Sequence, residues 1–203
     1  MAVSNLVTTG GLSTSDLISE TRWTLLTSQS FASAAQTQTI SGLSSYNYRK
    51  LKIVYAGRAG ASTGAIALRI NGDTGSVYQY HGLCVLGTGT APYTQSIAHN
   101  YAMDGTGYML TLYDAQQYGY LNHIANGTFL GEIEISNANN TDNKHIKSIS
   151  NYLHVSNYSA NLKSSGLYFP SSGAVISSVS LYNTNTTLGN GGWGYGMKLY
   201  GAN

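Results

Sequence analysis

The sequence predicts an all-β protein: a single antiparallel β-sandwich, jelly-roll-like, with a short N-terminal arm. Hydrophobic and polar residues alternate with a period of two over many short segments, which is the pattern of a half-buried strand. Glycine, asparagine and serine separate these segments where turns are needed. The 203 residues suit one domain, and 42% hydrophobic residues with a net charge of +2 exclude a disordered chain.

The N-terminal segment differs from the rest of the chain. Residues 1–21 carry no strand pattern, so we expect an arm or anchor, followed by the sandwich domain over residues 22–203. The first strands of that domain are predicted at Arg22–Thr27 and Thr37–Ser41. The arm lacks the features of a signal peptide, and no apolar run approaches the ~18 residues of a membrane span. We therefore expect a chain made in a cytoplasm, without membrane insertion.

Three alternating segments in the first half are predicted to be consecutive antiparallel strands. They cover Arg49–Gly57, Ala65–Ile70 and Val77–Val85. The turn cluster Asn71–Gly75 separates the last two and begins with Asn-Gly, the strongest short hairpin signal. The turn therefore favours a hairpin at this point.

The second half repeats the alternation in shorter and longer segments. In the longest of them Ile149, Leu153 and Val155 share one face, which is the apolar face of the predicted strand. The predicted segments are 129–135, His145–Val155, Leu167–Phe169, Val175–Leu181 and 197–199. Many short strands of this kind are typical of a sandwich or a jelly roll.

Two sequence motifs match catalytic or cofactor patterns but lie in the wrong context. Residues 60–64 read Gly-Ala-Ser-Thr-Gly, a nucleophile pattern that works only on a strand-to-helix elbow, and a strand-like run follows here. Gly189, Gly191 and Gly194 match a dinucleotide fingerprint, which must open a helix in a βαβ unit. We interpret both as glycine-rich loops and expect no enzyme activity and no cofactor.

Two groups of acidic or oxygen-rich residues are candidates for a hydrolytic site and a metal site. Glu132 and Glu134 lie on one face of a strand, roughly 7 Å apart, which a glycosidase pair would tolerate. The solvated face of a half-buried strand is the favoured interpretation, and a polysaccharide depolymerase remains an alternative. The loop 137–143 is rich in asparagine but poor in carboxylates, so we interpret it as a turn and expect no metal site.

The composition points to contact rather than chemistry. Charged residues make up only 9% of the chain, and seventeen tyrosines accompany three phenylalanines. Charged groups are depleted in buried interface cores, so a surface of hydroxyls and amides suits close packing among neighbours. Aromatic rings in glycine-rich loops can also stack on sugars, and the candidate glycan-binding residues are Tyr118, Tyr120, Trp193 and Tyr195.

Three stretches of the chain resemble a pattern in virion structural proteins of tailed bacteriophages. The run YRKLKIVYAGRAG…GAIALRINGDTGSVYQYHGL, from Tyr48 to Leu83, resembles their "dLkIv…R" strand followed by "LRfNgDtGsnY.y". The stretches NGTFLGEIEISNANNTDNKHIKSIS and AVISSVSLYNTNTTLGNGGWGYGMKLYGA resemble their central strands and their ending in "LYG". Where the pattern often has a tyrosine, this chain has Ser136-Asn137-Ala138, and the arm has no counterpart.

The resemblance implies a jelly-roll-like sandwich on the exterior of a phage particle, made in the host cytoplasm. It implies a capsid-decorating protein or a neck or tail appendage (fibre) subunit, with no catalytic residue. The expected partners are other virion proteins of the capsid, neck or tail, and a homo-oligomer, with a trimer favoured. A carbohydrate-binding receptor-recognition module that contacts a host-surface glycan is the alternative. The net charge of +2 gives no footprint for nucleic acid.

Overall fold

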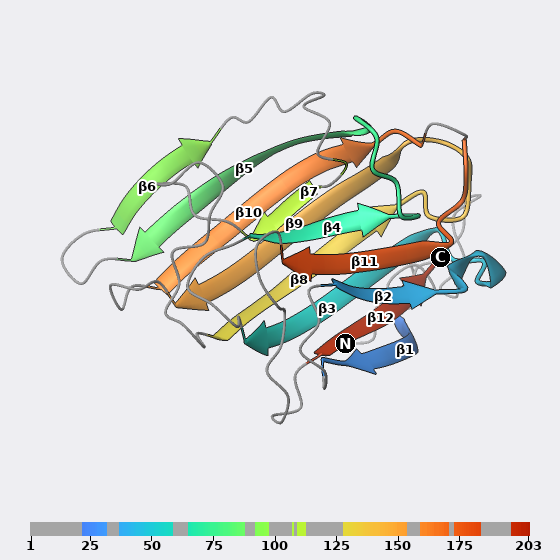
Figure 1. Ribbon diagram of the computed structural model, residues 1–203, viewed down its shortest axis with the longest axis horizontal. Helices are drawn as coiled ribbons and strands as arrows, with labels where there is room; N and C mark the ends of the chain where they lie inside the picture. The colour runs from blue at the N-terminus through green and yellow to red at the C-terminus, as the bar shows by residue number, and fades with distance from the viewer. Residues whose placement is uncertain are drawn as a thin grey trace, which may run out of the picture.

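The chain folds into two antiparallel sheets that lie face to face, as the computed structural model shows (Figure 1). The structure describes residues 22–31, 37–58, 65–87, 92–97, 107, 109–112, 128–153, 159–170, 173–183 and 196–203. The predicted N-terminal arm lies outside these ranges and stays a prediction.

The larger sheet has eight strands and the smaller has four. In spatial order the larger sheet contains β1 (Thr24–Ser30), β12 (Gly196–Ala202), β3 (Lys50–Arg58), β8 (Thr128–Ser136), β9 (Lys144–Leu153), β10 (Ser159–Tyr168), β5 (Tyr78–Gly87) and β6 (Pro92–Ile97). The smaller sheet contains β2 (Thr37–Ser41), β11 (Ser178–Asn183), β4 (Ile66–Ile70) and β7 (Met109–Leu112). One 3-10 helix, η1 (Leu43–Ser45), follows β2. The predicted all-β sandwich is confirmed, with its strands divided unequally between the two layers.

The hydrophobic core lies between the sheets. Ile53 on β3, Ile133 on β8 and Leu199 on β12 face it from the larger sheet and are fully buried. Ile66 and Leu68 on β4 face it from the smaller sheet. Full burial of each such side chain contributes about 1.5–3 kcal/mol to folding, so this layer supplies the main driving force for the sandwich.

The core also contains a layer of hydroxyl groups. Tyr55 on β3 shares a hydrogen bond of 2.6 Å with Ser150 on β9, and Ser150 donates to the carbonyl of Thr111 on β7 at 2.8 Å. Ser148 reaches the same carbonyl at 3.4 Å. Gly131 on β8 leaves room for this cluster, because a Cβ there would overlap the Tyr55 ring. Buried hydroxyls are tolerated here because they bond to one another.

The orientation of β9 differs from its sequence pattern. Ile149, on the face that the alternation marks as apolar, points outward and is 48% exposed, whereas Ser148 and Ser150 are buried. The register explains the reversal, because Ile149 pairs with Glu132 and Lys163, whose side chains also point outward. The partners of a strand, together with its own alternation, decide which face is buried.

The pairing of the strands predicted at 49–57, 65–70 and 77–85 also differs from expectation. The strands β3, β4 and β5 exist, but β4 lies in the smaller sheet while β3 and β5 lie far apart in the larger one. The Asn71–Gly75 turn therefore carries the chain from one sheet to the other instead of closing a hairpin. The hydroxyl of Tyr78 on β5 accepts a hydrogen bond from the backbone N–H of Ile70 on β4 at 2.8 Å, which links the two strands across the crossing.

One strand is longer than the sequence predicts, and two strands are not predicted at all. β10 runs over ten residues where only a short strand at Leu167–Phe169 was expected, and β6 and β7 were not expected. The β10 sequence, SANLKSSGLY, is rich in small and hydroxyl-bearing residues and has a weak apolar alternation. Backbone pairing with its neighbours β9 and β5 forms this strand, although its own sequence pattern does not predict it over the full length.

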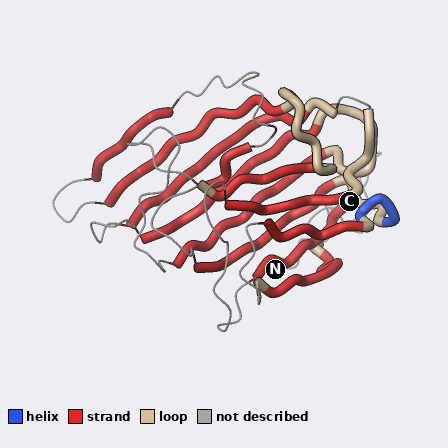
Figure 2. Tube along the Cα trace, viewed as in Figure 1, coloured by secondary structure: helices blue, strands red, loops and turns tan. Residues whose placement is uncertain are grey.

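The described loops gather at one end of the sandwich, beside η1 (Figure 2). Asn71, with a positive φ of 55°, holds two of them together. Its side-chain oxygen accepts from the backbone N–H of Ser177 at 2.7 Å, and its amide donates to the carbonyl of Val175 at 2.9 Å. The NGDTG segment therefore organises this end of the molecule.

Candidate functional site

The four aromatic residues proposed from the sequence for glycan binding lie outside the described residues. These are Tyr118, Tyr120, Trp193 and Tyr195. The glycine-rich motifs at 60–64 and 189–194 also lie outside them. The described part of the chain instead offers two features that sequence reasoning missed: an exposed sheet face and a pocket at one end.

The outer face of the larger sheet, which points away from the smaller sheet, carries exposed aliphatic side chains. Six large hydrophobic side chains are exposed among the described residues, and five of them lie on this face. They are Leu25, Val54, Leu83, Leu130 and Ile149. Leu130 and Ile149 are 56% and 48% exposed. Scattered exposed aliphatic side chains are ordinary, but a group of them on one face makes that face a candidate contact surface.

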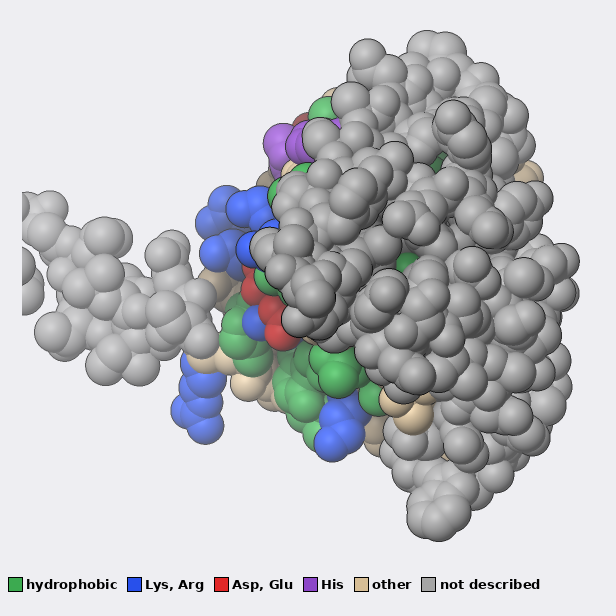
Figure 3. Space-filling model, turned by 90° about the vertical axis from the view of Figure 1, so that its left-hand side faces the viewer, with side chains coloured by type: hydrophobic (Ala, Val, Ile, Leu, Met, Phe, Trp, Pro, Cys, Tyr) green, Lys and Arg blue, Asp and Glu red, His purple; other side chains and the backbone are tan. Residues whose placement is uncertain are grey.

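Most of the lysines share this outer face. The chain has six lysines, and five belong to the face by strand register: Lys50, Lys52, Lys147, Lys163 and Lys198. One row across the sheet alternates aliphatic and charged groups, in the order Lys198, Val54, Glu132, Ile149, Lys163 and Leu83. Figure 3 shows basic, acidic, histidine and hydrophobic side chains side by side on this flank.

The two glutamates that raised a hydrolytic alternative are bound by one lysine. The ammonium of Lys52 lies 3.0 Å from a carboxylate oxygen of Glu132 and 3.0 Å from one of Glu134. Burial lowers the pKa of Lys52, but hydrogen bonds to both glutamates outweigh that effect and the pKa is raised. Lys52 also lies 4.6 Å from the centre of the Trp23 ring. These are the ion pairs of the described residues, so the other lysines of the face have no carboxylate partner within the described chain.

An open groove of about 450 Å³ crosses the outer face beside the sheet edge. Outward-pointing residues of β1, β3 and β12 line it, among them Ser28, Val54, Lys198 and Tyr200. Neither glutamate lines this groove. The groove therefore extends the contact surface and does not enclose the carboxylate pair.

A smaller pocket of about 280 Å³ lies at the loop end of the sandwich. It is formed by η1 and the segment after it, the start of β3, the β8–β9 loop and the residues before β11. Its lining residues are Leu43, Ser44, Tyr46, Asn47, Tyr48, Leu51, Ala138, Asn139, Val175 and Ile176. None of the described residues that line this pocket is charged, so the pocket would suit a neutral ligand.

The asparagine-rich loop 137–143 is organised around a lysine. Lys144 is fully buried, and its ammonium donates to the carbonyls of Asn140 and Asp142 at 2.6 Å each. Burial lowers the pKa of Lys144, and the nearby Asp142 partly opposes that shift. The ammonium therefore occupies the oxygen-lined position that a metal ion would need.

The described residues contain neither a metal site nor a membrane-spanning helix. Among them no group of three or more His, Cys, Asp or Glu side chains could hold a metal ion, and no helix is long and apolar enough to cross a membrane. Comparison with known proteins gives no match: no family model, no curated protein and no solved structure resembles the chain closely enough to be counted.

Proposed function

We propose that the protein is a non-enzymatic structural subunit on the exterior of a tailed-phage particle, as a capsid-decorating protein or a neck or tail appendage. It docks through the outer face of the larger sheet onto an acidic surface of a neighbouring virion protein. The single observation that supports docking is the presence of five exposed aliphatic side chains and five lysines on that one face. The sequence resemblance supports the phage particle.

The charge of the outer face indicates which partner suits it. Among the described side chains of the face, five lysines and two glutamates give a formal charge of +3, while the whole chain carries +2. Two copies that met through this same face would place like charges together, which costs free energy. An acidic partner surface would pair with the lysines while the aliphatic side chains supply buried apolar area.

The arrangement of Glu132 and Glu134 supports a non-enzymatic role. A glycosidase needs two carboxyl groups that flank a sugar and act separately, one of them as a proton donor. Here one ammonium bonds both carboxylates on an open sheet face. This arrangement pairs both carboxylates with the same ammonium, whereas the two carboxyl groups of a glycosidase must act separately.

The location is tested on purified phage particles with an antibody against the intact protein. We expect electron microscopy to show label on every particle, either over the head or at one vertex. Absence of the protein from purified particles that infect normally would contradict the proposal.

The docking face is tested by adding the purified protein to particles that lack it and measuring the bound fraction by sedimentation. Lys147→Glu with Lys163→Glu should reduce attachment at least tenfold, and raised salt should weaken the wild-type attachment. Arg49→Glu is a control, because it changes charge at an exposed residue outside the face. Equal attachment by all three proteins would refute docking through this face.

The homo-oligomer remains part of the proposal, with a trimer as the favoured state. Sedimentation equilibrium of the purified full chain should give a trimer mass. A monomer at high protein concentration would contradict it without affecting the docking test.

A further inference from the structure

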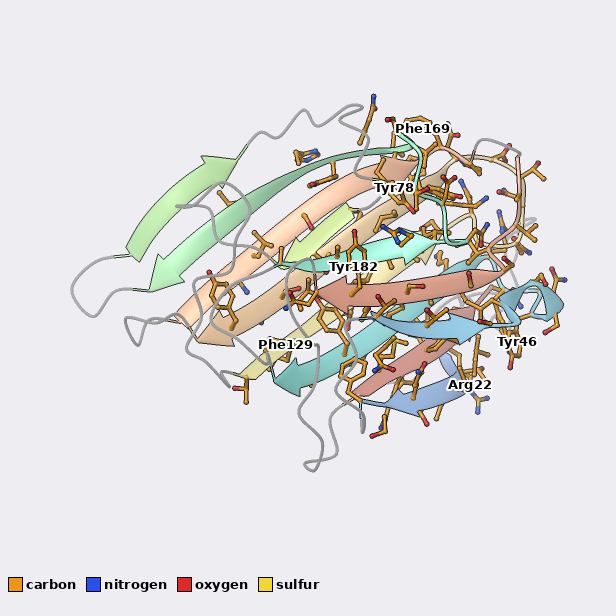
Figure 4. All side chains as sticks on the ribbon, viewed as in Figure 1. Arg22, Tyr46, Tyr78, Phe129, Phe169 and Tyr182 are labelled. Carbon is orange, nitrogen blue, oxygen red and sulfur yellow. The ribbon has the colours of Figure 1, made fainter. Side chains whose placement is uncertain are left out.

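The pocket at the loop end of the sandwich contains the one large exposed hydrophobic residue of the described chain that is not on the outer face. Tyr46 is 38% exposed and follows η1 at this end of the molecule (Figure 4). No charged side chain and no lysine of the outer face lines the pocket. The pocket is thus separate from the docking surface and needs its own explanation.

The walls of the pocket are fixed by hydrogen bonds between three segments. The backbone N–H of Leu43 donates to the carbonyl of Ser177 at 2.9 Å, and that of Ala138 donates to Arg49 at 2.9 Å. The N–H of Tyr46 closes its own loop on the carbonyl of Leu43 at 3.0 Å. A site held in this way is formed before a ligand arrives, which reduces the entropy cost of binding.

The floor of the pocket is apolar and its rim is polar. Leu43, Leu51, Ala138 and Ile176 form the buried floor. The rim carries two tyrosines and two asparagines together with Ser44. A sugar ring has an apolar face and a polar edge, so it matches a surface of this kind better than a wholly apolar group does.

The two asparagines of the rim present a matched donor and acceptor. The side-chain amide of Asn139 donates to the side-chain oxygen of Asn47 at 2.9 Å, and this hydrogen bond orients both groups. The Asn47 amide nitrogen and the Asn139 carbonyl oxygen have no other side-chain partner among the described residues. One group donates and the other accepts, as neighbouring hydroxyls of a sugar require.

We infer that this pocket binds a neutral saccharide through Tyr46, Asn47 and Asn139. Its volume of about 280 Å³ lies just below the usual range for ligand pockets, which begins at about 300 Å³, so it would hold one sugar ring. Tyr46 stacks on the apolar face of the ring, and the two amides bond its hydroxyls. This inference is independent of docking through the outer face, and either can fail while the other holds.

Saturation-transfer-difference NMR on the intact protein tests the inference. The probes are the methyl glycosides of glucose, galactose, mannose, rhamnose and N-acetylglucosamine, each at millimolar concentration. At least one should receive saturation, with a Kd on the order of 1 mM, as expected for a small ligand with few contacts. Tyr46→Ala and Asn139→Ala should each weaken that binding about tenfold, and Tyr46→Phe should retain it within about twofold.

Two controls make the result decisive. Leu130→Ala, on the outer face, should leave sugar binding unchanged, and each variant should keep the wild-type unfolding midpoint. Saturation transfer to none of the five probes, or equal transfer to wild type and to Tyr46→Ala, would overturn the inference. Binding of N-acetyl-leucine amide at this pocket without binding of any sugar would also overturn it, because the pocket would then accept an apolar peptide side chain.

Discussion

At the centre of β9 the two faces of the larger sheet carry the opposite chemistry from the one that a half-buried strand usually shows. Along β9 the buried face holds the hydroxyls of Ser148 and Ser150, and the exposed face holds the aliphatic side chain of Ile149. The buried hydroxyls are explained within the chain by their bonds to Tyr55 and Thr111. The exposed aliphatic groups have no such explanation within the fold. The difference teaches that folding accounts for the inner face, whereas the exposed aliphatic groups of the outer face are accounted for only by the docking that we propose.

The sharpest way to break this comparison is to change adjacent residues on opposite faces of β8. In Gly131→Ala the added Cβ would lie 2.6 Å from the Ser150 hydroxyl and overlap the Tyr55 ring. We expect the free energy of unfolding to fall by about 3 kcal/mol, because a packed core resists added volume. Leu130→Ala, at the exposed neighbour, should cost less than about 0.5 kcal/mol. Urea unfolding measures both, and equal losses would remove the distinction between the faces.

The hydroxyl layer gives the second largest expected effect. Ser150→Ala removes the nearest partner of the Tyr55 hydroxyl and the nearest donor to the Thr111 carbonyl, and leaves each with one longer hydrogen bond of 3.4 Å. A buried polar group left without its partner costs about 1–3 kcal/mol, so we expect a loss near 2 kcal/mol in urea unfolding. Ile149→Ser, the next residue on the other face, should cost under about 1 kcal/mol. A larger loss for Ile149→Ser would mean that the outer face contributes to folding after all.

Alkaline pH should reduce the contribution of the buried tyrosines of the inner face to the free energy of unfolding. Burial and the nearby Asp73 carboxylate raise the pKa of Tyr168 to about 12, and burial also raises the pKa of Tyr55. An unfolded tyrosine loses its proton near pH 10. The stabilisation is therefore complete below pH 10 and is lost as the pH rises from 10 to 12. The urea midpoint should fall over this range, and less steeply in Tyr168→Phe; identical slopes would contradict the assignment.

Substitutions of the exposed aliphatic side chains should have the smallest effect on stability and a large effect on attachment to particles. Leu130→Ser combined with Ile149→Ser removes exposed apolar area without opening a cavity. The urea midpoint should stay close to that of the wild type, while attachment to particles that lack the protein should fall about tenfold, or about 1.4 kcal/mol. Unchanged attachment would show that the aliphatic side chains are not part of the contact.

Much of the fold could be predicted from the alternation of side chains. That pattern located β3, β4, β5 and β8 because each alternates strongly enough to be recognised alone. It could not give partners, so the Asn71–Gly75 turn suggested a hairpin although the chain crosses between sheets there. Strand β10 was underestimated because its inner residues include Ser164, whose burial depends on neighbours far away in the sequence.

The candidate surfaces were harder to predict for the same reason. The pocket joins Tyr46, Asn139 and Ile176, which are separated by most of the chain and meet only through the loop contacts. The outer face could have been suspected from Lys147, which shares the phase of Ile149 on β9. Which of the two phases faces water is a property of the register with β8 and β10, and the sequence of β9 alone does not contain it.

The buried ammonium of Lys144 has a consequence for the surroundings that this protein can tolerate. Many oxygen-lined loops bind a calcium ion at their centre, and they lose their structure when the ion is removed. Here the charge is covalently part of the chain and cannot be diluted or chelated. The loop that carries Asn139 therefore needs no dissolved cation to keep its shape, and it should tolerate both low salt and strong chelators.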